Sequence, residues 1–312
     1  MNNAEKVVVF GGAGFLGSHV ADALTKKGYE VIIFDLVQSK YINEKQKMVI
    51  GDINDLDRIK QTVKGAQFVY HFAGLADINI SKKKPVETVK NNILGTTYVL
   101  EACNEFKIKR IVFASTIYVY SDLGSFYRSS KQACEMLIEN YSDEYKLDYT
   151  ILRYGSLYGH RANNFNFIKN AITQALVEGE IKRKGNGEEI RDYIHVIDAA
   201  KASVEILNDK YINSHIMIKG TQTIKVKNLL MMINEILGNN IKIKYTKGDQ
   251  YEGHYQLTPY SFRPRVAEKL LLKTYYDLGQ GLLDSVYDIY QELHKENSDN
   301  LVKISLSPPK KK

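Results

Sequence analysis

The stretch VVVFGGAGFLGSHVADAL near the start of the chain constrains the fold more than any other segment. A β-branched apolar run leads into Gly11, Gly14 and Gly17, and a helical pattern follows. In such a unit the first glycine permits a tight turn, the second lets a pyrophosphate approach the backbone, and the third allows close helix packing. The helix start at Phe15 and Leu16 then offers unpaired N–H groups to the phosphates. The unit predicts a dinucleotide-binding loop with these five residues as cofactor contacts.

Two carboxylates after this loop refine the cofactor prediction. Asp35 ends the predicted second strand, about 20 residues after the glycines, where a carboxylate accepts hydrogen bonds from ribose hydroxyls. A carboxylate there repels the extra phosphate of NADP, and no arginine follows it directly, so we expect NAD. Asp52 and its neighbour Ile53 end the third strand and are expected near the adenine. The alternative for Asp52 is the N-cap of the next helix.

Short β-branched runs alternate with longer helical patterns through the first half of the chain. Strands are predicted at 6–10, 30–35, 47–52, 68–74, 110–115 and 148–155. Helices are predicted at 18–29, 85–106 and 129–145. Continuous apolar strands alternating with amphipathic helices are typical of a parallel sheet covered by helices on both faces. The fold class is therefore α/β, a doubly wound Rossmann sheet.

The pattern changes after Gly159. Helices are expected at 163–179, 225–238 and 281–295, with strands at 213–220 and 241–248. We expect a Rossmann domain over 1–160, with 190–220 returning to its sheet, and a smaller C-terminal substrate-binding lobe from 161–189 and 221–300. Residues 301–312, which end in SPPKKK, are expected to form a disordered tail.

A hydroxyl, a phenol and an ammonium make a candidate catalytic set. Thr116 lies at a strand end in FASTIYVYSD, and Tyr127 and Lys131 are four residues apart, so they share a helix face. A phenol with a pKa of about 10 needs roughly 4 kcal/mol of anion stabilisation to act as a base near neutral pH. The Lys131 ammonium and a nicotinamide charge can supply much of it. The spacing is common by chance, but its place after the phosphate loop and the strand-end hydroxyl favours catalysis.

These motifs together resemble one family. The chain is similar to extended short-chain dehydrogenases/reductases of the nucleotide-sugar epimerase/dehydratase family through GGAGFLG, GDI, HFAG, NNILGTTYVLEA, FASTIYVY, YRSSK, LRYGSLYG and GNGEEIRDYIHVIDAA. The resemblance implies that Thr116, Tyr127 and Lys131 form the catalytic set. It implies that Ser115 supports the loop, with the alternative that Ser115 is the working hydroxyl.

The resemblance also places cofactor contacts outside the glycine loop. Lys131 would bind the nicotinamide ribose as well as assist Tyr127. Ala73 and Gly74 would lie along the cofactor, and Tyr154 would lie near the nicotinamide.

Two positions after Thr116 separate the reactions found in this family. Dehydratases typically carry Asp-Glu there, and decarboxylases of glucuronic acid sugars carry Glu at the second position. This chain has Ile117 and Tyr118, which cannot act as carboxylates. What remains is redox at carbon 4 of a nucleoside-diphosphate sugar through a 4-keto sugar. We expect a 4-epimerase; the alternatives are a 4-dehydrogenase that releases the keto sugar and a 4-ketoreductase.

The resemblance supplies substrate contacts too. Arg191 in RDYIHVIDAA would pair with phosphate oxygens, for which a guanidinium fork is suited. Arg263 is a second candidate phosphate arginine, with a surface role as its alternative. Ser156 stands where epimerases of the family often have a substrate-binding Asn, so UDP, GDP, dTDP and CDP sugars all remain open.

Composition excludes some partners and locations. The net charge is +7, but the sequence contains no clustered basic face with interleaved aromatic residues. We therefore do not expect nucleic-acid binding. The sequence has no apolar run of about 18 residues, so we do not expect a membrane span. The N-terminus lacks a signal-peptide pattern. Cys103 and Cys134 fall in helical patterns without metal-ligand spacing, so we expect buried thiols, no metal and a reducing cytoplasm.

The resemblance also bears on assembly and on rival functions. The helices at about 86–106 and 129–146 resemble the pair through which the family dimerises, so a homodimer is expected; the alternative is that they only cover the sheet. A reductase of another small carbonyl and a non-catalytic NAD(H)-sensing protein are the rival functions.

Overall fold

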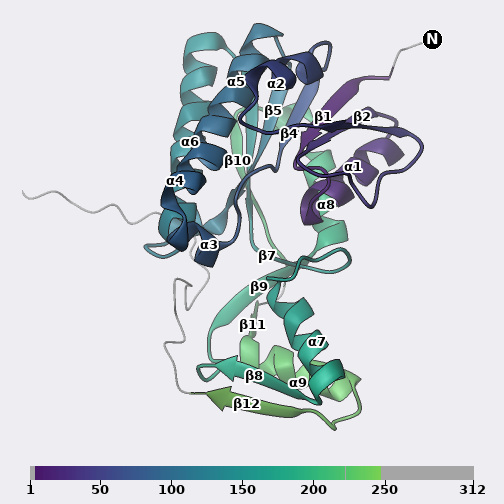
Figure 1. Ribbon diagram of the computed structural model, residues 1–312, viewed down its shortest axis with the longest axis vertical. Helices are drawn as coiled ribbons and strands as arrows, with labels where there is room; N and C mark the ends of the chain where they lie inside the picture. The colour runs from purple at the N-terminus through teal and green to yellow at the C-terminus, as the bar shows by residue number, and fades with distance from the viewer. Residues whose placement is uncertain (1–3, 222, 247–312) are drawn as a thin grey trace, which may run out of the picture. The chain divides into compact units, whose positions relative to one another are not determined.

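The main sheet has the strand order of a doubly wound fold. A computed structural model describes residues 4–221 and 223–246. Its seven-stranded sheet runs in the order β10-β6-β5-β4-β1-β2-β3, with every neighbouring pair parallel (Figure 1). The strands are β1 (Lys6–Phe10), β2 (Glu30–Asp35), β3 (Gln46–Ile50), β4 (Phe68–His71), β5 (Arg110–Thr116), β6 (Asp148–Tyr154) and β10 (Ser214–Ile218). The predicted Rossmann sheet is confirmed, and the order reverses between β1 and β4, where such sheets bind ligands.

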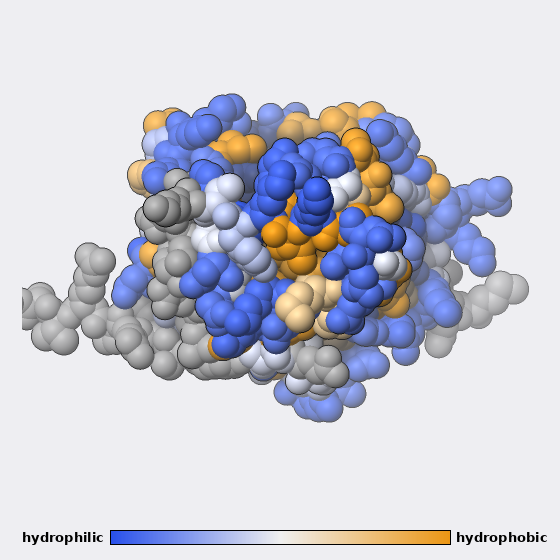
Figure 2. Space-filling view, turned by 90° about the horizontal axis from the view of Figure 1, so that it is seen from below, coloured by the Kyte–Doolittle hydropathy of each residue, from blue (hydrophilic) through white to orange (hydrophobic). Residues whose placement is uncertain are grey.

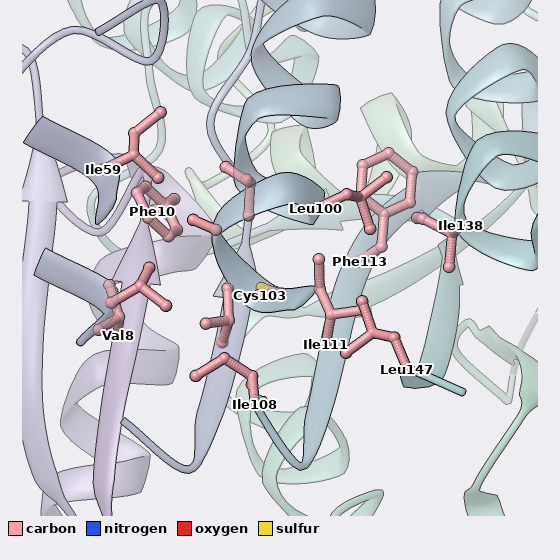
Figure 3. Packing of buried hydrophobic residues seen from close by; sticks show 14 of the residues in the cluster. Val8, Phe10, Ile59, Leu100, Cys103, Ile108, Ile111, Phe113, Ile138 and Leu147 are labelled. Carbon is pink, nitrogen blue, oxygen red and sulfur yellow. The ribbon is translucent and has the colours of Figure 1, made fainter. Parts of the chain in front are cut away.

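Helices cover both faces of this sheet. One face packs on α2 (Leu56–Val63), α5 (Gly95–Glu105) and α6 (Ser125–Tyr145), and the other on α1 (Phe15–Lys26) and α8 (Val196–Glu205). Alternate residues of β1 supply the two cores, because successive strand side chains point to opposite faces. Val8 and Phe10 join the first core with Ile59, Leu100, Phe113 and Ile138 (Figure 3), whereas Val7 and Val9 join the second.

The helix predicted over 85–106 is divided. It comprises α4 (Pro85–Thr88), a π-helical turn η1 (Val89–Leu94) and α5. A short α3 (Ile78–Lys83) precedes it, and a 3₁₀ turn η2 (Ile117–Tyr120) follows β5. Another 3₁₀ turn, η3 (Asp209–Tyr211), precedes β10. Of these turns, η2 lies where the chain leaves the sheet after β5, η3 lies where it returns to the sheet before β10, and η1 lies inside the helical segment.

The smaller lobe has its own core. Helices α7 (Phe167–Glu178) and α9 (Val226–Ile236) pack with the parallel pair β8 (Glu180–Lys184) and β12 (Lys242–Thr246) around Ala171, Ile181 and Leu230. Large apolar side chains on both helices stay exposed, including Leu176, Val177 and Ile236. Figure 2 shows the molecule from below. On the face seen there, apolar residues gather near the middle and hydrophilic residues surround them. The helix expected at 281–295 lies outside the described residues.

The return of residues 190–220 to the main sheet was predicted too broadly. Only β10 enters that sheet, beside β6. β9 (Ile190–His195) instead pairs with β7 (Ser156–Tyr158) and β11 (Thr223–Lys225) in a separate three-stranded sheet. Period-2 apolar patterns identify a strand but not its partner, because pairing is a long-range property.

Candidate active site

Close backbone packing explains two of the loop glycines. Gly11 has φ +76°, and a Cβ built on it would lie 2.6 Å from the backbone nitrogen of Ala73. A Cβ on Gly17 would lie 2.2 Å from the carbonyl oxygen of Gly11. A side chain at either position would therefore force the loop away from β4 or from α1. Sequence reasoning assigned the close packing to the third glycine, and the geometry agrees.

The helix after the loop is open to an anion at its N-terminus. Gly14 occupies the N-cap of α1 and supplies no side-chain hydrogen bond to the first turn. The first-turn residues Phe15, Leu16 and Gly17 line a large cavity. Uncapped N–H groups and the helix dipole favour a phosphate there. These residues therefore fit the pyrophosphate of a dinucleotide.

Asp35 lies beside the loop at the end of β2. Its Oδ2 accepts a hydrogen bond from the backbone N–H of Ala13 at 3.0 Å. The carboxylate is thereby fixed next to the turn that would carry the pyrophosphate. The ribose contact of Asp35 stays a prediction, and Asp35 does not itself line the large cavity.

The strand end predicted at Asp52 is wrong, whereas the adenine contact of Asp52 and Ile53 stays a prediction. β3 ends at Ile50, so Asp52 lies beyond the strand, exposed, and accepts from Asn54 at 2.8 Å. The alternative N-cap role is also wrong, because Asp55 caps α2 by accepting from the N–H of Arg58. Ile53 is buried beneath Gly95. Neither Asp52 nor Ile53 lines the large cavity.

The large cavity, of about 680 Å³, brings together most of the predicted site. The predicted residues that line it are Gly11, Gly14, Phe15, Leu16, Gly17, Gly74, Ser115, Thr116, Tyr127, Lys131, Tyr154, Ser156 and Arg191. Ala73 lies just behind, against Gly11. Arg263 lies outside the described residues. The lining joins the carboxyl ends of the main strands to α7, β8 and β9.

The candidate catalytic set is assembled at one point of this cavity. The Thr116 hydroxyl lies close enough to Tyr127 to lower the pKa of its phenol. Lys131, which is only 6% exposed, donates from Nζ to the carbonyl oxygen of Ala114 at 2.8 Å. The same Nζ lies 6.0 Å from the centroid of the Tyr127 ring. An alcohol oxygen bound against Thr116 and Tyr127 would thus meet both hydroxyls with an ammonium nearby.

The electrostatics of Tyr127 differ from the sequence-based expectation. Burial raises its pKa to about 12, and the hydrogen bond with Thr116 offsets only part of that effect. Burial also lowers the pKa of Lys131, while the nearby Cys134 and Glu135 act to raise it. Tyr127 is therefore a stronger proton acceptor but a less available anion than a free phenol. A further positive charge must enter the cavity before it can act as a base near neutral pH.

The two positions that would carry an acid in a dehydratase do not supply one. Ile117 is 1% exposed and packs inward, while Tyr118 lines the cavity. Among the described lining residues the only carboxylate is that of Asp77, which caps α3 by accepting from the N–H of Ile80 at 2.8 Å. The described cavity therefore lacks a carboxylate beside Thr116.

Three other predicted residues have identifiable neighbours. The Tyr154 hydroxyl lies 2.6 Å from Ser203 Oγ on α8, so its ring rather than its oxygen is available to the cavity. Arg191 is buried, donates to the carbonyl of Ile190 at 2.9 Å, and lines the cavity from β9. Ser156 lines it from β7.

Sequence reasoning missed two residues that shape this site. Asn92 in η1 accepts from the N–H of Leu75 at 2.6 Å and donates to Ser130 Oγ at 2.9 Å, which braces the segment after β4. Arg183 on β8 lines the cavity with its guanidinium 5.0 Å from the Phe167 ring and its charge paired with the buried Glu189. The asparagine lay in a quoted motif, whereas no local signal marked Arg183.

The charge of the lining favours an anionic ligand. The lining contains the cations Lys131, Arg183 and Arg191 and the carboxylate of Asp77, and the charge of Arg183 is paired with Glu189 behind it. A cleft of one sign raises the local concentration of oppositely charged ligands. The site combines this cationic lining with the glycine loop, the switch-point position and the Thr116–Tyr127–Lys131 set. Together these features are typical of a dinucleotide-dependent oxidoreductase.

Comparison with known proteins places the chain within that class. The sequence model of the NAD dependent epimerase/dehydratase family matches residues 7–218. A putative UDP-glucose 4-epimerase from Methanocaldococcus jannaschii is 30% identical over 302 residues, covering 88% of this chain and 95% of that protein. A UDP-N-acetyl-alpha-D-glucosaminuronate decarboxylase from Bacillus cytotoxicus is 28% identical over 277 residues, covering 80% and 86%.

A solved structure gives the same result. The UDP-glucose 4-epimerase from Thermotoga maritima, crystallised with UDP-glucose, aligns with a TM-score of 0.76 at 27% identity, covering 82% of this chain and 90% of that one. The chain belongs to the NAD dependent epimerase/dehydratase family. NAD is accordingly its cofactor, as the glycine loop and Asp35 predicted.

Some features bear on other expectations. Cys103 and Cys134 are buried free thiols, as predicted, and burial raises the pKa of both. Among residues 4–221 and 223–246, no helix has the length and apolarity needed to span a bilayer. In the same ranges, His, Cys, Asp and Glu side chains form no group of three or more suited to a metal ion.

Proposed function

We propose that this protein is a nucleotide-sugar 4-epimerase that works through a 4-keto sugar. The observation that carries the proposal is that Thr116, Tyr127 and Lys131 line one cavity together, without a carboxylate at positions 117 and 118. This set suits removal of hydrogen from a secondary alcohol. It does not suit loss of water or of carbon dioxide, which needs an acid or base on the next carbons.

The protein residues have separable tasks in this reaction. Thr116 and Tyr127 would hold the oxygen on carbon 4 between their hydroxyls, and Tyr127 would take its proton. NAD, when bound, accepts the hydride from carbon 4 and returns it. Tyr127 would keep the proton until the keto sugar presents its other face, and then give it back. Lys131 would hold a positive charge near the phenolate throughout.

The energy needed to ionise Tyr127 shows why these charges matter. Moving its pKa from about 12 to neutral pH requires roughly 7 kcal/mol. That pKa holds with Lys131 already in place, so the positive nicotinamide ring is the further charge that would lower it. Ionisation is thus expected only in the cofactor complex, which links proton transfer to hydride transfer.

The cationic lining supports a nucleoside diphosphate as the substrate's anionic part. Arg191 and Arg183 line the cavity from β9 and β8, on the side away from the glycine loop's own strand. The two relatives and the solved structure described above are UDP-sugar enzymes, so UDP-glucose is the first substrate to test. A reductase of an apolar carbonyl would not require these two arginines.

A mass-resolved assay against UDP-, GDP-, dTDP- and CDP-sugars tests the proposal. An isomer of unchanged mass supports the 4-epimerase. Loss of two hydrogens instead indicates a 4-dehydrogenase. Reduction of a 4-keto sugar by NADH indicates a 4-ketoreductase. Loss of water or carbon dioxide would refute the interpretation of Ile117 and Tyr118. NAD binding without any turnover would favour an NAD(H)-sensing protein.

Homodimerisation and a cytoplasmic location are part of the same proposal. Apolar side chains on α4, η1 and α6 are exposed, namely Val86, Val89, Leu94 and Met136. These lie within the two helical segments expected to pair with a second copy. Sedimentation equilibrium would distinguish a dimer from a monomer in which these segments only cover the sheet.

A further inference from the structure

Three successive residues at the end of β5 each contact a different residue of one face of α6. The Ala114 carbonyl accepts from Lys131, the Ser115 hydroxyl donates to Glu135, and the Thr116 hydroxyl lies near Tyr127, whose pKa it lowers. The helix residues are spaced four apart, so they form a single stripe. Two of these three contacts involve the candidate catalytic set. The third, between Ser115 and Glu135, has no assigned role.

Glu135 is held in place by a buried ion pair. Its side chain is 8% exposed, and Arg153 on β6 donates to it from Nε at 3.1 Å and from Nη2 at 2.6 Å. Arg153 is also the register partner of Ser115 in the β5–β6 pairing. Two parallel N–H donors fix a carboxylate in orientation as well as in charge. The carboxylate is therefore a rigid acceptor for Ser115.

The same network reaches the turn that follows β5. Arg153 Nη1 donates to the hydroxyl of Tyr120 in η2, and the Arg153 guanidinium lies 4.7 Å from that ring. β5, η2, α6 and β6 are thus joined through Glu135 and Arg153 behind the cavity. Thr116 lies between the two anchored residues Ser115 and Tyr120. Its position depends on both anchors.

We infer that Glu135 is a positioning residue, which through Ser115 and Arg153 fixes the end of β5 so that Thr116 and the Ala114 carbonyl meet Tyr127 and Lys131. The assignment extends the proposed function and rests on it for the identity of the reaction. It also gives Ser115 a role other than the working hydroxyl, because its donor is engaged by Glu135. The Glu135 charge additionally opposes the effect of burial on the Lys131 pKa.

The test compares Glu135→Gln and Ser115→Ala with the wild type in steady-state kinetics. We expect kcat to fall about tenfold to 100-fold, since displacement of reacting groups by about 1 Å has that effect. KM for the nucleotide sugar should stay within about twofold in Glu135→Gln, because Glu135, unlike Ser115, does not line the cavity. The matched control is Asp209→Asn, which breaks an ion pair with buried Arg110 at the opposite end of β5 and should change neither constant.

A second variant keeps the inference testable if Glu135→Gln does not fold. The double variant Glu135→Met/Arg153→Met replaces a buried ion pair with apolar side chains, which proteins often tolerate. It should fold yet show the same selective loss of kcat. A double variant with wild-type kcat would overturn the inference, as would unchanged kcat in both single variants.

Hydrogen–deuterium exchange separates this inference from the proposed reaction. We expect faster exchange of the peptide 113–121 in Glu135→Gln and Ser115→Ala, but not in Asp209→Asn. If the wild type turns over no nucleotide sugar while this difference persists, the reaction is wrong and the positioning role stands. If turnover is found but exchange in this peptide is unchanged, the positioning role is wrong and the reaction stands.

Discussion

Replacing Lys131 by methionine should move the pH dependence of the reaction by a predictable amount. The Lys131 Nζ lies 6.0 Å from the Tyr127 ring centroid. At an effective dielectric constant of about 20, a unit charge at that distance stabilises a phenolate by roughly 2.8 kcal/mol. That energy corresponds to about two pKa units. The neutral methionine has a similar length and suits a buried site.

The sign follows from the role of Tyr127 as a base. The phenol must be deprotonated to accept the proton from the sugar, so activity rises with pH up to the apparent pKa of Tyr127 in the complex. Lys131→Met should raise that pKa and move the acid limb of the kcat profile upward by about two pH units. At a pH below both pKa values kcat should be about 100-fold lower.

The assay is the pH profile of kcat at saturating NAD and nucleotide sugar. Saturating NAD removes any loss of cofactor affinity from the measurement. Lys201→Met on α8 is the control, because this lysine is exposed and does not line the cavity. A lower kcat with the acid limb in its original place would refute the electrostatic role and leave Lys131 only a binding or packing role.

The remaining predictions concern the base, the cofactor and the loop. Tyr127→Phe should keep NAD affinity, measured by calorimetry, but lower kcat by about 10²–10⁴-fold; Tyr141→Phe on the same helix, whose hydroxyl bonds to Glu101 instead, should not. Asp35→Ala should weaken NAD binding at least tenfold in the same titration, and equal affinity would remove its ribose role. Gly17→Ala should lower the thermal midpoint, because the new Cβ would lie 2.2 Å from the Gly11 carbonyl and such overpacking costs about 1–3 kcal/mol or more.

Local sequence signals predicted those parts of the molecule whose cause is local. The strand–glycine–helix unit fixed β1, the loop and α1, because a left-handed φ at Gly11 and the close approach at Gly17 both demand glycine. Tyr127 and Lys131 meet because they are four residues apart on α6. Thr116 joins them because the ends of parallel strands share one edge of the sheet.

Other features depended on contacts between distant segments. The two-residue error at the end of β3 moved Asp52 out of the strand, and the capping role went to Asp55. The alternating apolar pattern of β9 did not predict that it pairs with β7 and β11. Arg183 resembles any surface arginine until β8 brings it against Phe167 and the buried Glu189. The pKa of Tyr127 is likewise a property of its burial, which the sequence did not give.

The raised pKa of Tyr127 has a consequence for how the reaction would be controlled. A base that is protonated in the cofactor-free protein cannot deprotonate water or a stray alcohol. It becomes competent only when a positive charge enters the cavity, and the oxidised nicotinamide carries such a charge whereas the reduced form does not. In the proposed reaction that charge would be absent while the cofactor is reduced, and Tyr127 would then retain its proton. In the proposed reaction, the buried phenol would thus couple its own protonation to the redox state of the cofactor.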